Sequence, residues 1–567
     1  MPKLPALPTV TAARTRARSS KAATGRSPGV LLAVYAPLGT DEALSRYPNE
    51  NPAAPIAPIE QQALVKALQA TAAEGVNVCA LVDVFDDDSY LVEIPAFRPA
   101  AMSVMSTWKQ DMSDRHALTA FLRRAHQRFP CDALVLAIEG HGGGFVPDID
   151  YGRITPASVT QVVGGTQRVR WVQTASLVTV EADPAALPRQ MISPTLASAE
   201  RGAPAETRTP TPRDGMSPPL QMVSPTLQMV SPTLPPGRLP MSTWAYGEAL
   251  RLAIKAGVPK PVVIHFNNCF NASTELLHTV APFAGFASAY ANYDFFTAGA
   301  AYPCVFRNLR LAGTATAEQL ARWFVKENGE LLRHKGNHPI IGATVRLSRM
   351  AGVTDKLAQL SRKLTAALRS STGEAVRDTV AQAARDAQHY DTVPGYVLKV
   401  PDQFIDVGSF ARALALGFAA SDPDIAAAAE AVRVAASGLW QWGDDDWPWM
   451  GRDPSIRYDF RDTQLGLNIF FPDPGLDGIW DWRSPYYLSG TVDPAKPPAH
   501  RHVIPFLADV AGRSPAWVEF IVEYHNTTKF KGFHPPQPFV FPVFNRKFDP
   551  KADGNGPKPP TTGKPRG

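Results

Sequence analysis

Continuous apolar runs, separated by stretches of helical periodicity, make up most of the chain between residues 29 and 290. The runs that predict strands are 30–36, 76–83, 133–138, 262–266 and a shorter one near Phe286. The stretches that predict amphipathic helices are 59–73, 114–129, 243–256 and 272–281. Ser113 is the expected N-cap of the second helix, since a hydroxyl there can accept from free backbone N–H groups. Strands that are apolar throughout and alternate with helices indicate an α/β fold, a mostly parallel sheet flanked by helices.

A Pro-, Ser- and Thr-rich stretch interrupts this order between residues 151 and 240. It holds three copies of a Met-x-Ser-Pro-Thr-Leu repeat, which begin at Met191, Met222 and Met229. A repeat this short does not form a stacked array, so we expect a disordered, exposed insertion. The insertion divides the sheet-forming chain into a first part, 29–150, and a second part, 241–345.

A different pattern follows the sheet-forming part. Helices are predicted over 356–369 and 374–387, and strand-like runs begin at Phe404 and Gly466. These elements predict a C-terminal α+β region over 346–544. The remaining ends of the chain are a basic tail, 1–28, and a Pro-, Gly- and Lys-rich tail, 545–567, and both are expected to be disordered.

Composition narrows the possible functions. Of the 567 residues, 45% are hydrophobic, which allows a large core, and the net charge is +5. The basic tail contains no aromatic residue, so it lacks the stacking groups of a nucleic-acid groove and no nucleic-acid partner is expected. No apolar run has membrane-spanning length and no signal peptide is visible. We therefore expect a cytoplasmic protein without a membrane segment, with export by another route left open.

The four cysteines are too few for a disulfide framework in a chain of this length. Cys79 and Cys131 lie in or beside apolar runs and are expected to be buried, inert thiols. Cys304 has no informative context.

Chemistry is concentrated at the ends of two predicted strands. The third strand runs into Glu139-Gly-His141-Gly-Gly-Gly, and the fourth runs into Asn267-Asn-Cys269. The carboxyl ends of parallel strands share one edge of a sheet, so His141 and Cys269 would face each other if the strands are neighbours. A histidine can take the proton of a cysteine nucleophile. The backbone N–H groups of Cys269 and of Gly142 or Gly143 could then stabilise an oxyanion.

Each signal has an ordinary structural explanation: a buried cysteine, a structural histidine and a tight glycine turn. Their occurrence together at equivalent strand ends favours catalysis. A His-Gly-Gly-Gly run also occurs in esterases, which need a Gly-x-Ser-x-Gly turn downstream. The one match here, Gly25–Gly29, lies upstream in the basic tail, so the esterase hypothesis is the weaker one.

No metal site is expected from the sequence. His500 and His502 lack a clustered set of partners, and the Asp86–Asp88 and Asp444–Asp446 runs lack the spacing of a calcium loop.

The His and Cys segments and their context resemble the clostripain family of cysteine peptidases, within the caspase-like clan. The resemblance is carried by Val34-Tyr35, the 76–83 strand, Asp111–Asp114, His141–Phe145 and Phe266–Glu275. It implies a caspase-like fold, a protein or peptide substrate and cleavage through a Cys/His dyad. It also implies processing between the His and Cys strands, where the insertion lies. Calcium is implied only by this resemblance, and no other cofactor is expected.

Two positions depart from the family pattern. The family's aspartate two residues before the nucleophile, which is implied to hold a basic P1 side chain, is Asn267 here, and its methionine is Asn271. We therefore expect a neutral P1 residue to be accepted at least as well as a basic one. Glu139 is the alternative acid for this substrate-binding role. The alternative function is a catalytically inactive, caspase-like scaffold that binds peptides, and the sequence leaves the oligomeric state open.

Overall fold

The structure is a computed structural model. It describes residues 9–11, 29–40, 42–49, 51, 53–149, 160–163, 166–169, 241–292, 294, 296–336, 341–390, 404–439, 466–471, 487, 500–508 and 515–527.

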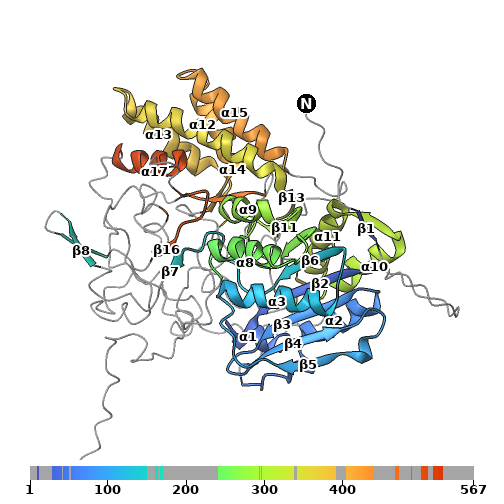
Figure 1. The fold of residues 1–567 in the computed structure, drawn as a ribbon. Coiled ribbons are helices and arrows are strands. Elements are labelled where there is room, and N and C mark those ends of the chain that lie inside the picture. The colour runs from blue at the N-terminus through green and yellow to red at the C-terminus, as the bar shows by residue number, and fades with distance from the viewer. Residues whose placement is uncertain are drawn as a thin grey trace, which may run out of the picture.

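An eight-stranded sheet forms the centre of the molecule (Figure 1). Its strands, in spatial order, are β13 (Gly342–Arg346), β11 (Phe286–Tyr290), β10 (Val263–Phe266), β6 (Ala133–Ile138), β2 (Val30–Pro37), β3 (Asn77–Asp83), β4 (Ser89–Ile94) and β5 (Ser103–Ser106). The five strands from β11 to β3 are mutually parallel, and β13, β4 and β5 pair antiparallel at the two sides. The predicted α/β class, a mostly parallel sheet flanked by helices, is confirmed.

The central strands are buried on both faces, which is why their sequences are apolar without alternation. Odd-numbered residues of β2, such as Leu31 and Tyr35, belong to one core, and even-numbered ones, such as Leu32, belong to the other. The first core is covered by α3 (Arg115–Arg128), α8 (Thr243–Lys255) and α9 (Thr274–Val280). The second is covered by α2 (Ala63–Ala73), α10 (Tyr302–Ala312) and α11 (Ala317–Gly336), while α1 (Glu42–Arg46) is a short helix after β2.

The observed elements agree closely with the predicted ones, with three differences at helix starts. The cap of α3 is Asp114, whose carboxylate accepts from the His116 N–H at 2.8 Å, and not Ser113. The Ser113 hydroxyl is engaged by Asp111 instead. Helix α2 starts at Ala63, after a 3-10 turn over Ile59–Gln61, and α12 (Met350–Leu368) starts six residues earlier than 356. Buried Met350 and Val353 extend the apolar stripe of α12 toward its amino end.

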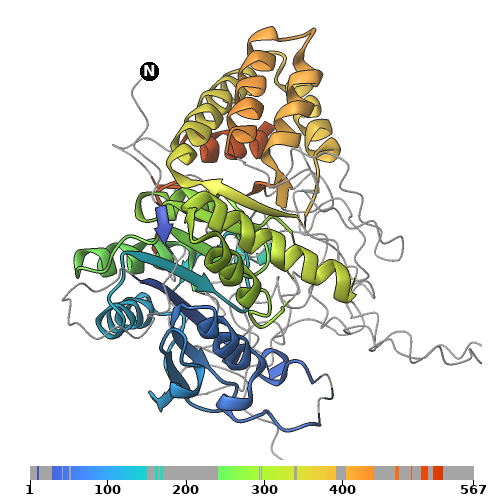
Figure 2. The same ribbon diagram turned by 90° about the vertical axis from the view of Figure 1, so that its right-hand side faces the viewer.

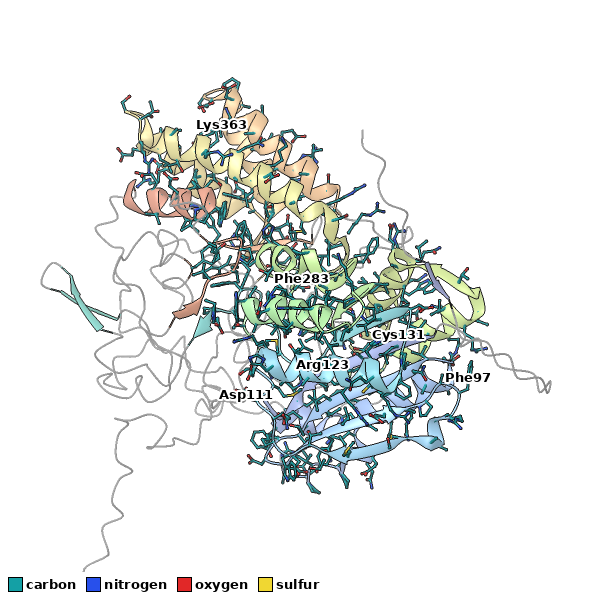
Figure 3. All side chains as sticks on the ribbon, viewed as in Figure 1. Phe97, Asp111, Arg123, Cys131, Phe283 and Lys363 are labelled. Carbon is teal, nitrogen blue, oxygen red and sulfur yellow. The ribbon has the colours of Figure 1, made fainter. Side chains whose placement is uncertain are left out.

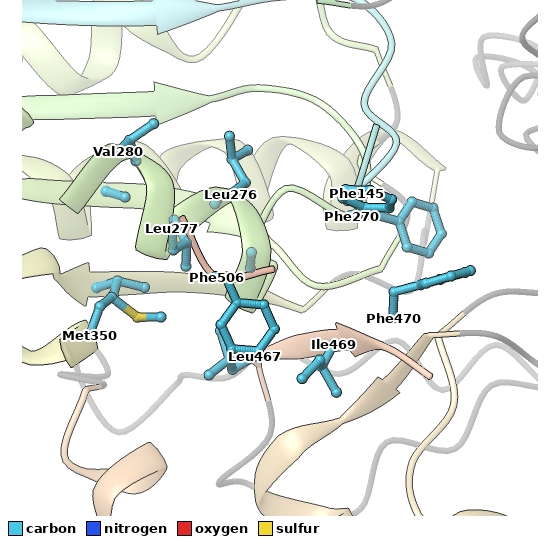
Figure 4. Close-up of a cluster of buried hydrophobic side chains, with 14 of the residues drawn as sticks. Phe145, Phe270, Leu276, Leu277, Val280, Met350, Leu467, Ile469, Phe470 and Phe506 are labelled. Atoms are coloured by element: carbon cyan, nitrogen blue, oxygen red, sulfur yellow. The ribbon is translucent and has the colours of Figure 1, made fainter. Parts of the chain in front are cut away.

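The C-terminal region is mostly helical and packs on the α9 side of the sheet (Figure 2). It contains α12, α13 (Gly373–Asp386), α14 (Val407–Phe418), α15 (Pro423–Ser437) and α17 (Ala516–Thr527). A two-stranded sheet of β14 (Phe404–Asp406) and β15 (Asn468–Phe470) joins it to the central sheet, through side chains that pack near α9 (Figure 4). The predicted α+β character of this region is therefore observed in its described part.

Short strands occur inside two segments that were expected to be disordered. Within the basic tail, β1 (Thr9–Thr11) pairs with β12 (Thr314–Thr316), because a Thr-Val-Thr run has the β-branched composition of a strand. Within the insertion, β8 (Thr160–Val163) pairs with β9 (Thr166–Val169), two runs separated in sequence by two glycines. The three repeats, the 545–567 tail and Asp444–Asp446 lie outside the described residues.

The insertion is bounded by ordered contacts. Before it, β7 (Asp148–Ile149) pairs with β16 (His500–His502). The His502 imidazole lies 2.6 Å from the Asp148 carboxylate and stacks on Trp244, which follows the insertion. His502 thus packs against Trp244 and contacts Asp148, while His500 pairs with Ile149 through the backbone.

Candidate active site

The two strands that carry the chemistry are neighbours in the sheet. Strands β6 and β10 pair in parallel, with Val135 opposite Val263 and Ile138 opposite Phe266. The adjacency that the sequence could not establish is therefore observed. It brings the segments that begin at Glu139 and Asn267 to the same carboxyl edge of the sheet.

The glycine loop after β6 lies against the backbone of Cys269. A Cβ atom at Gly142 would come within 2.8 Å of the Cys269 nitrogen and 2.9 Å of its carbonyl carbon, and closer still to its carbonyl oxygen. Gly140 and Gly144 on either side have φ values of +91° and +59°, which side chains rarely adopt. His141, which is half-buried, immediately precedes the residue in contact with Cys269. The glycines are thus required by close approach and by backbone conformation.

Cys269 is held in a closed environment. Its side chain is 8% exposed, and its Sγ contacts the backbone of Asp294, whose N–H lies 3.4 Å away and whose carbonyl oxygen lies 3.5 Å away. Burial raises the pKa of the Cys269 thiol to about 12. This direction is opposite to the activated thiol that a histidine neighbour suggests, because desolvation outweighs the other influences in this arrangement.

The turn that follows the nucleophile is anchored by the C-terminal region. Phe270 has φ of +61°, which is uncommon for a residue with a side chain. The Asn468 side-chain amide donates to the carbonyl oxygens of Phe270 at 2.9 Å and Ala291 at 2.8 Å. Asn468 in β15 therefore joins the nucleophile turn to the end of β11. The sequence indicated a strand here but gave no signal for this role.

An aromatic cluster closes the same side of the site (Figure 4). Phe145, at the end of the glycine loop, lies 6.1 Å from Phe470 between ring centroids, and Phe270 lies 5.5 Å from Phe404. Phe404 and Phe470 are themselves 5.6 Å apart. The His loop and the Cys turn are thus packed against β14 and β15.

The two predicted substrate-binding residues contact each other below the edge of the sheet. Asn267 Nδ2 donates to both carboxylate oxygens of Glu139, at 3.0 and 3.1 Å. Asn328 of α11 donates to Asn267 Oδ1 at 3.2 Å, and the Tyr302 hydroxyl donates to Glu139. Burial raises the pKa of Glu139 to about 7 against the lowering effect of these hydrogen bonds. The participation of Tyr302 and Asn328 was not predicted, since neither α10 nor α11 was assigned from the sequence.

Cys79 is fully buried as expected, whereas Cys131 is partly exposed because it precedes β6 at the edge of the core (Figure 3). Asn271 donates to Asn268 at 2.6 Å. In the esterase-like Gly25–Gly29 match, only Gly29 belongs to the described residues.

The described part of the chain has neither a cluster of metal ligands nor a membrane-length apolar helix. No group of three or more His, Cys, Asp or Glu side chains is positioned there to hold a metal ion. In the Asp86–Asp88 run, the Asp87 carboxylate accepts from Tyr90 and the Asp88 carboxylate accepts from Ser106. No helix in the described ranges is long and apolar enough to span a bilayer.

Fold and site together define an α/β protein with a histidine loop and a cysteine turn at one sheet edge. No protein-family model and no curated protein matches the sequence. Among solved structures, the chain is similar to a secreted C11 cysteine protease from Bacteroides thetaiotaomicron, "iotapain", with 10% identity and a TM-score of 0.45 over 81% of this chain and 97% of that one. It is also similar to an inactive zymogen C11 protease from Parabacteroides distasonis, with 11% identity and a TM-score of 0.43 over 81% and 99% of the two chains. C11 denotes the clostripain family.

Proposed function

We propose that the chain is a cysteine endopeptidase in which Cys269 is the nucleophile and His141 the general base. The observation that carries the proposal is the backbone contact between Gly142 and Cys269 at the carboxyl edge of β6 and β10. This contact supports a dyad because His141 adjoins one side of it and Cys269 forms the other. The substrate is a protein or peptide, and the reaction needs no cofactor, so EDTA is expected to leave the activity unchanged.

The reaction follows from the chemistry of the two side chains. His141 takes the thiol proton as Cys269 Sγ attacks the scissile carbonyl carbon, and the carbonyl oxygen becomes an oxyanion. The backbone N–H groups of Gly142 and Cys269 stabilise this oxyanion. The C–N bond then breaks, the amine leaves with the proton from His141, and a thioester remains on Cys269. Water, deprotonated by His141, hydrolyses the thioester and restores the thiol.

The burial of Cys269 supports a resting state that must open before catalysis. A thiol with a pKa near 12 holds its proton at neutral pH, so attack requires proton transfer to His141 during the step itself. Self-cleavage in the 151–240 insertion is the proposed activating event. Deletion of residues 190–235 is expected to raise the initial rate on a small fluorogenic peptide and to remove any lag. Unchanged activity, with the same lag, would leave the repeats without a regulatory role.

The decisive experiment compares cysteine variants of the purified chain. Cys269→Ala is expected to abolish peptide cleavage and self-cleavage fragments in mass spectrometry, and His141→Ala is expected to do the same. Cys131→Ala is the matched control, because Cys131 precedes β6 and lies toward its amino end, away from the proposed site. Full activity in Cys269→Ala would refute the assignment.

The burial of the thiol also favours a second candidate, a scaffold that binds peptides at the same edge without cleaving them. In that case peptides would bind to wild-type protein and to Cys269→Ala with equal affinity, and neither would give products. Turnover that depends on both Cys269 and His141 excludes this alternative.

A further inference from the structure

Glu139 and Asn267 occupy equivalent places in two neighbouring strands. Each is the first residue after its strand, and the last strand residues, Ile138 and Phe266, are paired in register. The Asn267 N–H donates to the Ile138 carbonyl at 2.9 Å, which continues the parallel ladder by one step. Each residue therefore lies two positions before a member of the proposed dyad.

The side chains of this pair form a bridge between the two strand ends. The Asn267 amide nitrogen lies 3.0 and 3.1 Å from the two Glu139 carboxylate oxygens. The Asn267 oxygen accepts from Asn328, and Glu139 accepts from Tyr302. Asn267 is 3% exposed and Glu139 is fully buried. Both ends of the Asn267 side chain are thus engaged inside the protein.

We propose that Asn267 is a positioning residue whose amide, by donating to Glu139, holds the Cys269 strand end and the His141 strand end at the separation that the dyad requires. The proposal rests on the peptidase function above. In this proposal Asn267 aligns the two members of the dyad and does not contact the P1 side chain of the substrate.

The chemistry of the pair explains why an amide suits this position. Only a neutral donor can bridge to a buried carboxylate without adding charge. An aspartate at 267 would put two carboxylates about 3 Å apart, and one of them would have to keep a proton. The titratable side chains around the pair, among the described residues, are Tyr302, Tyr290, Asp294 and His265. They supply no compensating positive charge at neutral pH, since burial lowers the pKa of His265 to about 3.

The structure permits an isosteric exchange of donor and acceptor. In the double variant Glu139→Gln/Asn267→Asp, the new amide at position 139 can donate to the new carboxylate at position 267. Asn328 can still donate to position 267, and Tyr302 can still donate to position 139. Three of the four contacts remain hydrogen bonds, with no change in side-chain length. The fourth, at 3.1 Å, becomes a contact between the amide oxygen at position 139 and the carboxylate at position 267. The test compares wild type, both single variants and this double variant, on peptides with a neutral or an arginine P1 residue.

Asn267→Asp is expected to lower kcat at pH 8 by about 100-fold, since a shift of about 1 Å in reacting groups costs that much. The loss should be equal for the two peptides, with KM little changed, and smaller at pH 6, where the paired carboxylates share a proton. The double variant is expected to recover part of the lost kcat, because the bridge between positions 139 and 267 keeps one hydrogen bond. A merely structural role predicts a lower unfolding midpoint, with kcat per folded enzyme equal to that of wild type.

Two results would overturn the inference. One is an Asn267→Asp variant whose kcat on the neutral peptide equals that of wild type. The other is a switch toward arginine at P1, in both Asn267→Asp and the double variant, which would assign position 267 to the substrate pocket. Failure of the peptidase proposal is distinguishable, because wild type itself would then be inactive. The bridge would still be tested by the thermal stabilities of the four proteins, which should show the same loss and recovery.

Discussion

The backbone contact between the His loop and the Cys turn provides the sharpest test of the proposed site. Replacing Gly142 with alanine adds a Cβ atom that would lie 2.8 Å from the Cys269 nitrogen and nearer still to its carbonyl oxygen. Both are backbone atoms, which cannot rotate away. Ordinary contact requires about 3.4 Å or more, so the His loop and the Cys turn must separate by about 1 Å. A displacement of this size between reacting groups costs about 100-fold in rate.

The assay is kcat/KM for a fluorogenic peptide, measured with the thermal unfolding midpoint. Gly143→Ala is the matched control, because it makes the same substitution in the same loop. Its Cβ would meet only the Val146 Cγ2 atom, at 3.0 Å, and that side chain can adjust. We expect Gly142→Ala to lose about 100-fold in kcat/KM and Gly143→Ala to lose less than about tenfold. The unfolding midpoints should differ much less than the rates.

The reasoning is refuted if Gly142→Ala retains activity within about threefold of wild type at unchanged stability. It is also refuted if Gly143→Ala is as inactive as Gly142→Ala. In the first case, the contact between the two strand ends would not set the geometry of the dyad. In the second, the whole loop would be sensitive, and the particular contact with Cys269 would explain nothing.

The buried groups make three further predictions. Iodoacetamide should modify partly exposed Cys304 before Cys269 in the resting chain at pH 8, because a pKa near 12 leaves only roughly 1 in 10,000 Cys269 thiols ionised. Faster labelling of Cys269 would contradict the closed arrangement. The pKa of Glu139 rises on folding from 4.5 to about 7, so its contribution of about 3 kcal/mol to the free energy of unfolding is complete below pH 4.5 and is lost as the pH rises to 7. Urea unfolding of wild type should show this decline in stability, and Glu139→Gln should lack the part that Glu139 causes. Asn468→Ala should lower the free energy of unfolding by about 2 kcal/mol or more, because the buried carbonyls of Phe270 and Ala291 lose their donor. Asn468→Asp should lower it further, and equal stabilities of these two variants would contradict the assigned contacts.

The five parallel strands of the sheet were predictable because they are buried on both faces, whereas the antiparallel strands β4, β5 and β13 were not predicted. A strand such as β6 must be apolar at every position, and the ends of its apolar run therefore predict both ends of the strand correctly. The helices α10 and α11 were missed, although α11 carries a recognisable stripe that includes Leu320, Phe324 and Leu332. The cap of α3 was misplaced by one residue because Ser113 and Asp114 are both good caps. Which of them caps depends on Asp111, which binds the Ser113 hydroxyl.

The proposed dyad was visible in the sequence because each member follows an apolar strand directly. Partners contributed by distant elements were not visible. Tyr302 lies 163 positions from Glu139 in the chain, and Asn328 lies 61 positions from Asn267. The raised pKa of Cys269 could not be predicted from the sequence either, since desolvation depends on the complete fold and not on neighbouring residues.

The C-terminal region takes part in the geometry of the proposed nucleophile. Phe270 adopts a left-handed backbone conformation, which costs about 1–3 kcal/mol and persists only where the surroundings impose it. The surroundings here are supplied largely by β15: Asn468 donates to the Phe270 carbonyl, and the Phe470 N–H donates to the buried Glu275 of α9, 195 positions earlier in the chain. The turn that presents Cys269 is therefore not determined by the strand that precedes it. It is determined by a β-strand that the chain supplies after the entire sheet is complete, so the sheet without β15 would retain the sequence of the site but lose the contacts that fix its shape.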